Sequence, residues 1–160
     1  GSAASAGLQQ VITTASVDEL AAVISGLPKN ERERLGMALP GLSETTMGYH
    51  KIRGLAGPLR MMYFFKGQNF TQVSYGADAN EAWFAGDKPK LAKQNSCINL
   101  PYIIEGGRVV TMSITCMLYL GQCLGIDKEA DFIYNHTVLD QTMDLRNSLI
   151  KIVYPSAQYP

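Results

Sequence analysis

The chain has 160 residues, 46% of them hydrophobic and 18% charged, so its composition is that of one folded domain or of one domain plus a fragment. Fourteen basic and fourteen acidic residues balance, which argues against a nucleic-acid partner and against a polybasic membrane patch. The apolar runs are too short to span a bilayer and no signal-peptide core is recognisable, so we expect no transmembrane segment and no secretion.

The chain has three cysteines, Cys97, Cys116 and Cys123, with neither a paired framework nor metal-site spacing. We therefore expect free thiols, no bound metal, and a reducing compartment. This compartment is expected to be the cytoplasm or an organelle, such as a plastid or mitochondrion after removal of a transit peptide. The opening GSAASAG fits either an expression scar or the residue of a cleaved targeting sequence.

The first predicted elements form an N-terminal helical hairpin, which we assign with its linker to residues 1–44. Ser16 and Glu19 have the spacing of a capping box at the start of one helix. Pro28 ends that helix and can begin the next. Because both helices are amphipathic, we expect the hairpin to pack on the main domain or on a partner.

From about residue 45 the hydrophobic pattern alternates between strands and helices. The pattern predicts a strand at 46–50, a helix at 55–67, a strand at 69–75, an irregular polar stretch at 79–97, a strand hairpin at 101–112 and a helix at 113–126. Asp127 can cap a long final helix that continues to about Tyr154. This order favours an α/β (mixed α+β) fold, a small mixed sheet flanked by helices with its first two strands parallel.

Several motifs occur in order along this region. They are Tyr49 followed by Lys51 and Arg53, Trp83 followed by Lys88, Asn99-Leu100-Pro101-Tyr102, Thr111-Met112-Ser113, and finally Gln141-Thr142-Met143-Asp144 with Tyr154 ten residues after Asp144. The chain from about residue 47 onward resembles the glutathione transferases, the Mu class most closely. The resemblance implies a thioredoxin-like βαβ-α-ββα domain at 45–126 and, at 127–160, the start of the family's all-helical domain.

The resemblance implies that the chain binds glutathione, a peptide with two carboxylates, an amine and a thiol. Met112 and Ser113 stand where a helix begins, and exposed amides there suit the γ-glutamyl carboxylate. The resemblance implies a cis peptide bond before Pro101, which would let the backbone of Leu100 pair with the cysteinyl part of glutathione. The remaining implied contacts are Trp83, Lys88 and Asn99 at the glycyl end, and Asp144 reaching the γ-glutamyl amine of the neighbouring subunit in a homodimer.

The resemblance gives Tyr49 and Tyr154 catalytic roles. A phenol aimed at the glutathione sulfur would donate a hydrogen bond to the thiolate and lower the pKa of the thiol. The thiolate would then attack a small electrophile, and Tyr154 would donate to the developing oxyanion or leaving group. For Arg53 the resemblance implies a structural role facing the helix.

Each of these residues also has a structural interpretation. Tyr49 can be a half-buried strand tyrosine, Trp83 a packing residue, and Ser113 a plain helix cap. Pro101 can be structural, Asp144 a solvated carboxylate, and Tyr154 the end of a helix. His50 and His136 have no partners at metal-ligand spacing, and Cys97 fits a small buried hydrophobic residue.

The sequence departs from the family pattern in several places. Met112 stands where a glutamine or glutamate is usual, which predicts weaker glutathione binding because a thioether cannot donate a hydrogen bond. His50 replaces an aromatic residue, and the segment before Trp83 is shorter. After YPSAQYP we expect either a longer natural chain or a shortened relative. In the shortened relative, an apolar face on the final helix would lack its cover: Ile133, Val138, Leu139, Met143, Leu149, Ile150 and Val153.

Two functions follow from these patterns. The first is a glutathione transferase that conjugates glutathione to small electrophiles. The second is an inactive or weakly active accessory subunit that docks onto a larger protein assembly, favoured by the short helical part, the added hairpin and Met112. A thiol-disulfide oxidoreductase is disfavoured, because there is no C-x-x-C and Tyr49 stands where its cysteine would be.

Overall fold

The structure of the chain, a computed structural model, describes residues 44–127 and 129–154 together with residues 16, 19, 22, 23, 26–28 and 31. The predicted capping box is confirmed. The Ser16 amide donates to Glu19 Oε2 over 2.9 Å, and the Glu19 amide donates to Ser16 Oγ over 3.3 Å. The hydrogen bond from the Ser16 amide also lowers the pKa of Glu19. The rest of the predicted hairpin lies outside the described residues.

The described part of the chain contains a four-stranded sheet in the order β2-β1-β3-β4. Its strands are β1 (Thr45–His50), β2 (Thr71–Tyr75), β3 (Tyr102–Glu105) and β4 (Arg108–Thr111). Strands β1 and β2 are parallel, as predicted, and the other two pairs are antiparallel. The β3–β4 hairpin turns through Gly106 and Gly107, whose φ angles of 54° and 79° require the conformational freedom of glycine.

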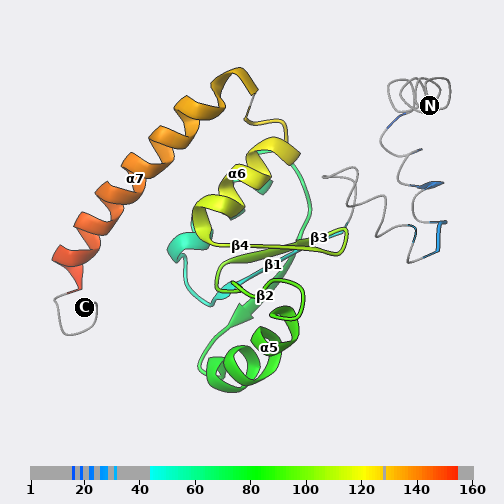
Figure 1. Ribbon diagram of the computed structural model, residues 1–160, viewed down its shortest axis with the longest axis horizontal. Helices are drawn as coiled ribbons and strands as arrows, with labels where there is room; N and C mark the ends of the chain where they lie inside the picture. The colour runs from blue at the N-terminus through cyan, green and yellow to red at the C-terminus, as the bar shows by residue number, and fades with distance from the viewer. Residues whose placement is uncertain are drawn as a thin grey trace.

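Helices lie on both faces of the sheet (Figure 1). They are η1 (Gly54–Ala56), α4 (Gly57–Phe65), the π-helix η2 (Asn80–Asp87), α5 (Lys88–Leu91), α6 (Ser113–Cys123), η3 (Glu129–Asp131) and α7 (Phe132–Val153). The prediction of an irregular stretch at 79–97 was wrong, because η2 and α5 make residues 80–91 helical. No β-branched residue interrupts 79–93, and Pro89 lies in the first turn of α5, where its missing amide costs no helical hydrogen bond.

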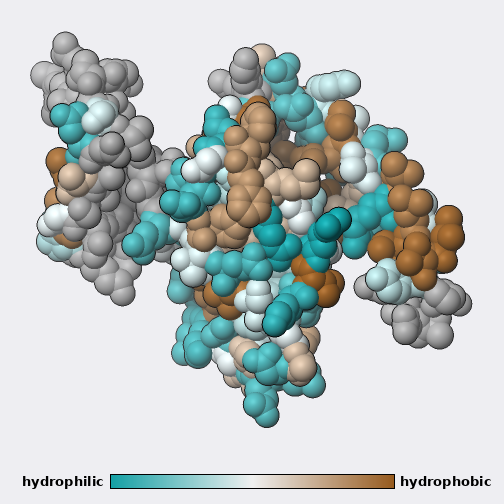
Figure 2. Space-filling model, turned by 180° about the vertical axis from the view of Figure 1, so that it is seen from behind, coloured by the Kyte–Doolittle hydropathy of each residue, from teal (hydrophilic) through white to brown (hydrophobic). Residues whose placement is uncertain are grey.

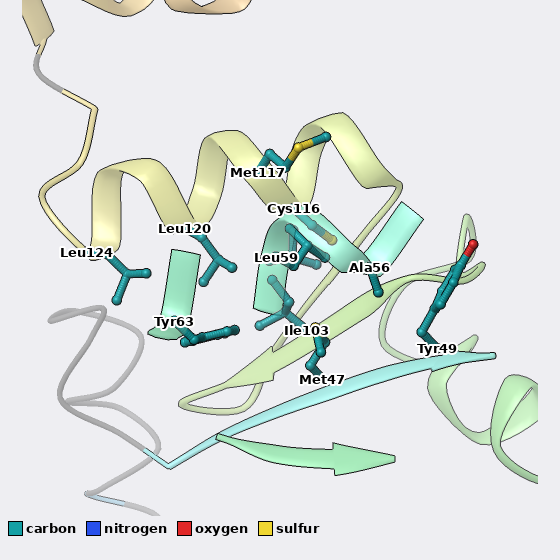
Figure 3. Packing of buried hydrophobic residues seen from close by; sticks show 11 residues of the cluster. Met47, Tyr49, Ala56, Leu59, Tyr63, Ile103, Cys116, Met117, Leu120 and Leu124 are labelled. Atoms are coloured by element: carbon teal, nitrogen blue, oxygen red, sulfur yellow. The ribbon is translucent and has the colours of Figure 1, made fainter. Parts of the chain in front are cut away.

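The two faces of the sheet carry two separate hydrophobic clusters, and alternate residues of β3 and β4 contribute to both. Met47, Ile103 and Val110 belong to the cluster on the side of α4 and α6, which also includes Leu59 and Leu120 (Figure 3). The other face packs on η2 and α5. That second cluster contains Tyr75, Trp83, Leu91, Ile98, Tyr102 and Val109. The two-residue period of the strands therefore supplies both layers of the sandwich.

Helix α6 ends in the hydrogen-bond pattern that glycine at a helix C-terminus favours. Gly125 has φ of 61°, its amide donates to Gln122 O over 3.1 Å, and the Ile126 amide donates to Gly121 O over 2.8 Å. The predicted cap by Asp127 was wrong, since α7 begins at Phe132 and has no side-chain cap. The Asp127 carboxylate instead accepts a hydrogen bond from the Asn135 side-chain amide.

Helix α7 extends away from the sheet, and none of its described side chains is fully buried (Figure 1). Leu139 and Met143 pack against the α4–α6 cluster. Several other apolar residues of the helix are exposed: Ile133 (76%), Val138 (44%), Leu145 (62%), Leu149 (53%), Ile152 (79%) and Val153 (66%). Apolar side chains accordingly gather at the end of the molecule that α7 occupies (Figure 2). Of the predicted apolar face, Ile133, Val138, Leu149 and Val153 are therefore exposed, whereas Leu139 and Met143 are covered by the α4–α6 cluster.

Candidate functional site

Strand pairing brings three of the predicted motifs to one edge of the sheet. Tyr49 lies at the carboxyl end of β1, and the preceding Gly48 pairs with Tyr102 at the start of β3. Residues 99–101 therefore lie beside Tyr49. Tyr102 also pairs with Thr111 at the end of β4, so Met112 and Ser113 emerge at the same edge. The sheet thus assembles a composite site from Tyr49 and from segments 50 to 64 residues further along the chain.

Tyr49 lies at the border of the α4–α6 cluster, with its hydroxyl pointing away from the other labelled side chains (Figure 3). The tyrosine is 5% exposed. Its oxygen accepts a hydrogen bond from the Leu55 amide over 3.1 Å. Because that contact occupies a lone pair of the oxygen and not its proton, the hydroxyl can still donate to a second group.

The loop that follows β1 is shaped to admit the Tyr49 ring. Gly54 has φ of 39°, and a Cβ there would lie 2.8 Å from both the ring and the hydroxyl of Tyr49. On the other side, the His50 ring meets Tyr49 edge-on, with centroids 5.4 Å apart. His50 therefore makes an aromatic contact with Tyr49 at the end of β1.

A threonine that was not among the predicted site residues holds two of the motifs together. The Asn99 amide donates to Thr111 Oγ1 over 2.9 Å, and Thr111 Oγ1 donates to Asn99 O over 2.7 Å. Thr111 is buried, so these hydrogen bonds are protected from competition with water. The Leu100–Pro101 peptide bond is cis, which confirms that prediction. Thr111 therefore fixes the loop at 99–101 against the start of α6.

Met112 has an unusual backbone conformation, with φ of 73° and ψ of 133°. Methionine seldom adopts positive φ, so the surrounding structure must hold it there. It is the N-cap residue of α6, and the Cys116 amide donates to its carbonyl. The amides of residues 113–115 have no intrahelical acceptor and form a potential anion-binding group with the Ser113 hydroxyl. The Met112 side chain is 53% exposed.

Trp83 and Lys88 lie on the opposite face of the sheet from α4 and α6. Trp83 is 1% exposed, with its ring stacked on Tyr102 at 5.7 Å and tilted against Tyr75 at 5.2 Å. Its packing interpretation is therefore confirmed, and its predicted contact with a glycyl carboxylate would depend on the indole N–H. Lys88 Nζ lies 5.5 Å from the centre of the Phe84 ring, a cation–π contact that leaves the ammonium able to bind a carboxylate.

A hydrogen-bond chain under Trp83 was not expected from the sequence. The Tyr75 hydroxyl donates to Asp87 over 2.9 Å and lies 2.9 Å from the Tyr102 hydroxyl. Asp87 also pairs with Lys90 over 3.2 Å. Burial raises the pKa of both tyrosines, so they remain protonated hydrogen-bond donors at neutral pH. This network positions Trp83 and the start of α5.

The remaining predicted residues, Asp144 and Tyr154, lie on α7 and at its end. Asp144 is exposed, and its backbone carbonyl accepts from the Ser148 hydroxyl. Tyr154 is 43% exposed and follows the last residue of the helix. The structure does not group either residue with the Tyr49 edge, so their roles stay predictions. Arg53, the predicted helix-facing cation, is exposed, with its Cγ near Gly57 at the start of α4.

Within the residues that the structure describes, no three histidine, cysteine or acidic side chains gather as a metal site would need. None of the described helices combines the length and apolar character needed to cross a bilayer.

Comparisons with known proteins place this geometry among the glutathione transferases, although no protein-family model matches the chain. The chain is 32% identical over 111 residues to the class-mu 26 kDa glutathione S-transferase isozyme 51 of Fasciola hepatica, covering 68% of the chain and 49% of the relative. It is 30% identical over 114 residues to glutathione S-transferase Mu 1 of Mus musculus, covering 68% and 51%. The chain spans about half the length of these relatives.

Solved structures agree on the fold. A Nu-class glutathione transferase from Haemonchus contortus matches with a TM-score of 0.51 and 23% identity over 70% of the chain and 50% of that structure. A glutathione S-transferase of Caenorhabditis elegans matches with a TM-score of 0.57 and 20% identity over 69% and 53%. These likenesses support the thioredoxin-like domain followed by a partial helical domain. These relatives and structures support a glutathione transferase family for the chain, at modest identity and over about two thirds of its length and half of theirs.

Proposed function

We propose that the chain binds glutathione and that Tyr49 activates its thiol for conjugation to a small electrophile. The observation that carries the proposal is the hydrogen bond from the Leu55 amide to the Tyr49 oxygen. It fixes the phenol at the sheet edge and leaves its proton to be donated. A donor aimed at the glutathione sulfur favours the thiolate over the thiol.

The shift that this activation requires in the pKa of the glutathione thiol is within the range that protein sites produce. A free thiol has a pKa of about 8.5, and lowering that pKa by about two units makes the thiolate dominant at neutral pH. Such a shift requires that the site stabilise the thiolate relative to the thiol by roughly 2.7 kcal/mol. The thiolate sulfur then forms a bond to the electrophilic carbon of the substrate. The electron pair leaves with the displaced group or collects on an oxygen, and we propose that Tyr154 donates a proton there.

The rest of the proposed site holds the peptide of glutathione. The backbone of Leu100, beside Pro101, pairs with the cysteinyl residue, while the α6 amides and Ser113 hold the γ-glutamyl carboxylate. Lys88, Trp83 and Asn99 bind the glycyl end. In a homodimer, Asp144 of the neighbouring subunit binds the γ-glutamyl amine. Thr111 supports this arrangement because it ties residue 99 to the end of β4.

Met112 weakens the proposed site. Its thioether replaces an amide or a carboxylate that could contact the γ-glutamyl group, and loss of such a charge-assisted contact costs about 1.5–3 kcal/mol. We therefore expect Met112→Gln to strengthen glutathione binding by about tenfold or more. The measurement is a calorimetric titration of both proteins with glutathione.

The decisive experiment separates binding from activation. Tyr49→Phe keeps the ring but removes the hydroxyl, so glutathione affinity should persist while the thiolate absorbance of bound glutathione at neutral pH disappears. Tyr134→Phe, an equivalent change at a residue that is 72% exposed on α7, is the matched control. Absence of any glutathione heat in the unmodified chain would eliminate the proposal. A Tyr49→Phe protein with unchanged thiolate absorbance would eliminate the role of the phenol.

A second candidate function is an accessory subunit of a larger assembly. The observation that favours it is the exposed apolar face of α7. In that case the isolated chain should self-associate or precipitate, and Met112→Gln should leave its role unchanged. A stable dimer that conjugates glutathione would argue for the transferase.

A further inference from the structure

A cationic hollow lies between the loop after β1, helix α4 and strand β2. It has a volume of about 660 Å3. Three of the side chains that line it are positively charged, namely Lys51, Arg53 and Arg60, and the others include Ile52, Met61 and Gln72. No acidic residue is among the lining residues. None of the residues assigned above to glutathione lines this hollow.

The guanidinium of Arg60 donates hydrogen bonds to neutral acceptors. Its Nε donates to Gln72 Oε1 over 2.8 Å, and one terminal nitrogen donates to the carbonyls of Ile52 and Arg53 over 3.3 and 3.1 Å. These contacts give the guanidinium hydrogen-bond acceptors but do not neutralise its positive charge. The guanidinium therefore joins α4 to β2 and to the loop while keeping its positive charge at the wall of the hollow.

Backbone contacts position Lys51 and Arg53, the two cationic residues of the loop after β1. The Lys51 amide donates to Tyr75 O over 2.8 Å at the end of β2. The stem of Arg53 passes over Gly57, where an added Cβ would lie 3.1 Å from Arg53 Cγ. The nearby Asp78 carboxylate accepts from the Gly76 amide over 3.2 Å, and it does not line the hollow. Both loop side chains are exposed, so a ligand can reach them from solvent.

We propose that this hollow binds a phosphate-bearing ligand. Three like charges around one recess repel one another, and an anion between them removes that repulsion. The planar guanidinium of Arg53 presents paired donors that match the oxygens of a phosphate, and the Lys51 ammonium adds a point charge. Arg60, whose Nε and one terminal nitrogen already have acceptors, contributes its charge and its second terminal nitrogen. Because Arg60 is already fixed by its neutral partners, part of the site is formed before the ligand arrives. The proposal does not depend on glutathione binding.

The test is a titration of the full chain with pyrophosphate, followed by backbone amide NMR at constant ionic strength maintained with chloride. We expect shifts centred on Ile52, Arg53 and Gln72. Arg53→Gln should raise the dissociation constant about tenfold, as expected for loss of one charge-assisted contact. Lys93→Gln removes the same charge at an exposed position outside the hollow and should leave the constant unchanged.

The outcomes separate a site from general attraction. Equal weakening by Arg53→Gln and Lys93→Gln, or no weakening by Arg53→Gln, would overturn the proposal, since binding would then follow net charge. Displacement of pyrophosphate by saturating glutathione would also overturn it, because the hollow would then belong to the glutathione site. If Arg53→Gln does not fold, Lys51→Gln gives the same comparison, with the same weakening expected.

Discussion

The sheet domain, residues 45–126, and helix α7 differ in how they bury apolar surface. In the sheet domain, Met47, Leu59 and Ile103 are fully buried in a cluster that two helices and the sheet share. Along α7 no described side chain is fully buried, and Leu139 and Met143 are the described apolar residues of the helix that pack against that cluster. The difference indicates that the sheet domain stabilises itself, whereas α7 has an apolar face suited to a further partner.

The largest expected effect is in the sheet core. Leu59→Ala removes a side chain that is 0% exposed between α4 and the sheet, so we expect a loss of about 2–5 kcal/mol in the free energy of unfolding. Leu149→Ala is the same change at a residue that is 53% exposed on α7 and should cost less than about 0.5 kcal/mol. Urea denaturation measures both. Equal losses would mean that the α7 face is buried in solution.

The next effect concerns the threonine that holds the candidate site together. Thr111→Val keeps the shape but leaves the backbone groups of Asn99 without their partner, so we expect a loss of about 1–3 kcal/mol in stability. Thr71→Val is a control at an exposed threonine at the start of β2, away from the candidate site. Calorimetry should show weaker glutathione binding for the first variant alone. Unchanged stability and binding would contradict the role given to Thr111.

A smaller effect tests how α7 is attached. Met143→Ala removes a half-buried side chain that packs on the α4–α6 cluster, so we expect a loss of about 1–2 kcal/mol and faster amide hydrogen exchange along α7. Leu145→Ala, at 62% exposure, should leave the exchange of α7 unchanged. If Met143→Ala speeds exchange equally in β1 and β3, the two regions form one cooperative unit and the comparison fails.

The smallest effect at neutral pH comes from two thiols of α6. Burial raises the pKa of Cys116 to about 12 and that of Cys123 to about 11. In the unfolded chain these thiols ionise at lower pH, so their contribution to stability is complete below about pH 8.5 and is lost as the pH rises towards the folded values. Denaturation from pH 7 to 11 should show this decline. Cys97 is exposed, so the expectation that it is a small buried residue was wrong, and thiol labelling at pH 8 should modify it first.

Local sequence patterns predicted most of the strands and helices, because these elements depend largely on residues that are close together in the chain. The alternation of Met47 and Tyr49 with Gly48 marked a strand, and the pair of glycines at 106–107 marked a hairpin. The prediction failed at 79–97, where polar residues with Gly86 and Pro89 looked irregular. There the burial of Trp83 and Leu91 against the sheet stabilises η2 and α5. The start of α7 was also misplaced, because Asp127 bonds to a side chain rather than to a helix end.

The sequence by itself determined the order of the strands and helices outside residues 79–97, the family, and the chemical types of the candidate site residues. The tertiary structure alone decided that Thr111 joins Asn99 to α6, that Trp83 is enclosed by Tyr75 and Tyr102, and that a cationic hollow forms beside α4. The physical reason is the range of the interactions. Periodicity and turn chemistry act within a few residues, whereas strand pairing brings together groups that are far apart in the chain.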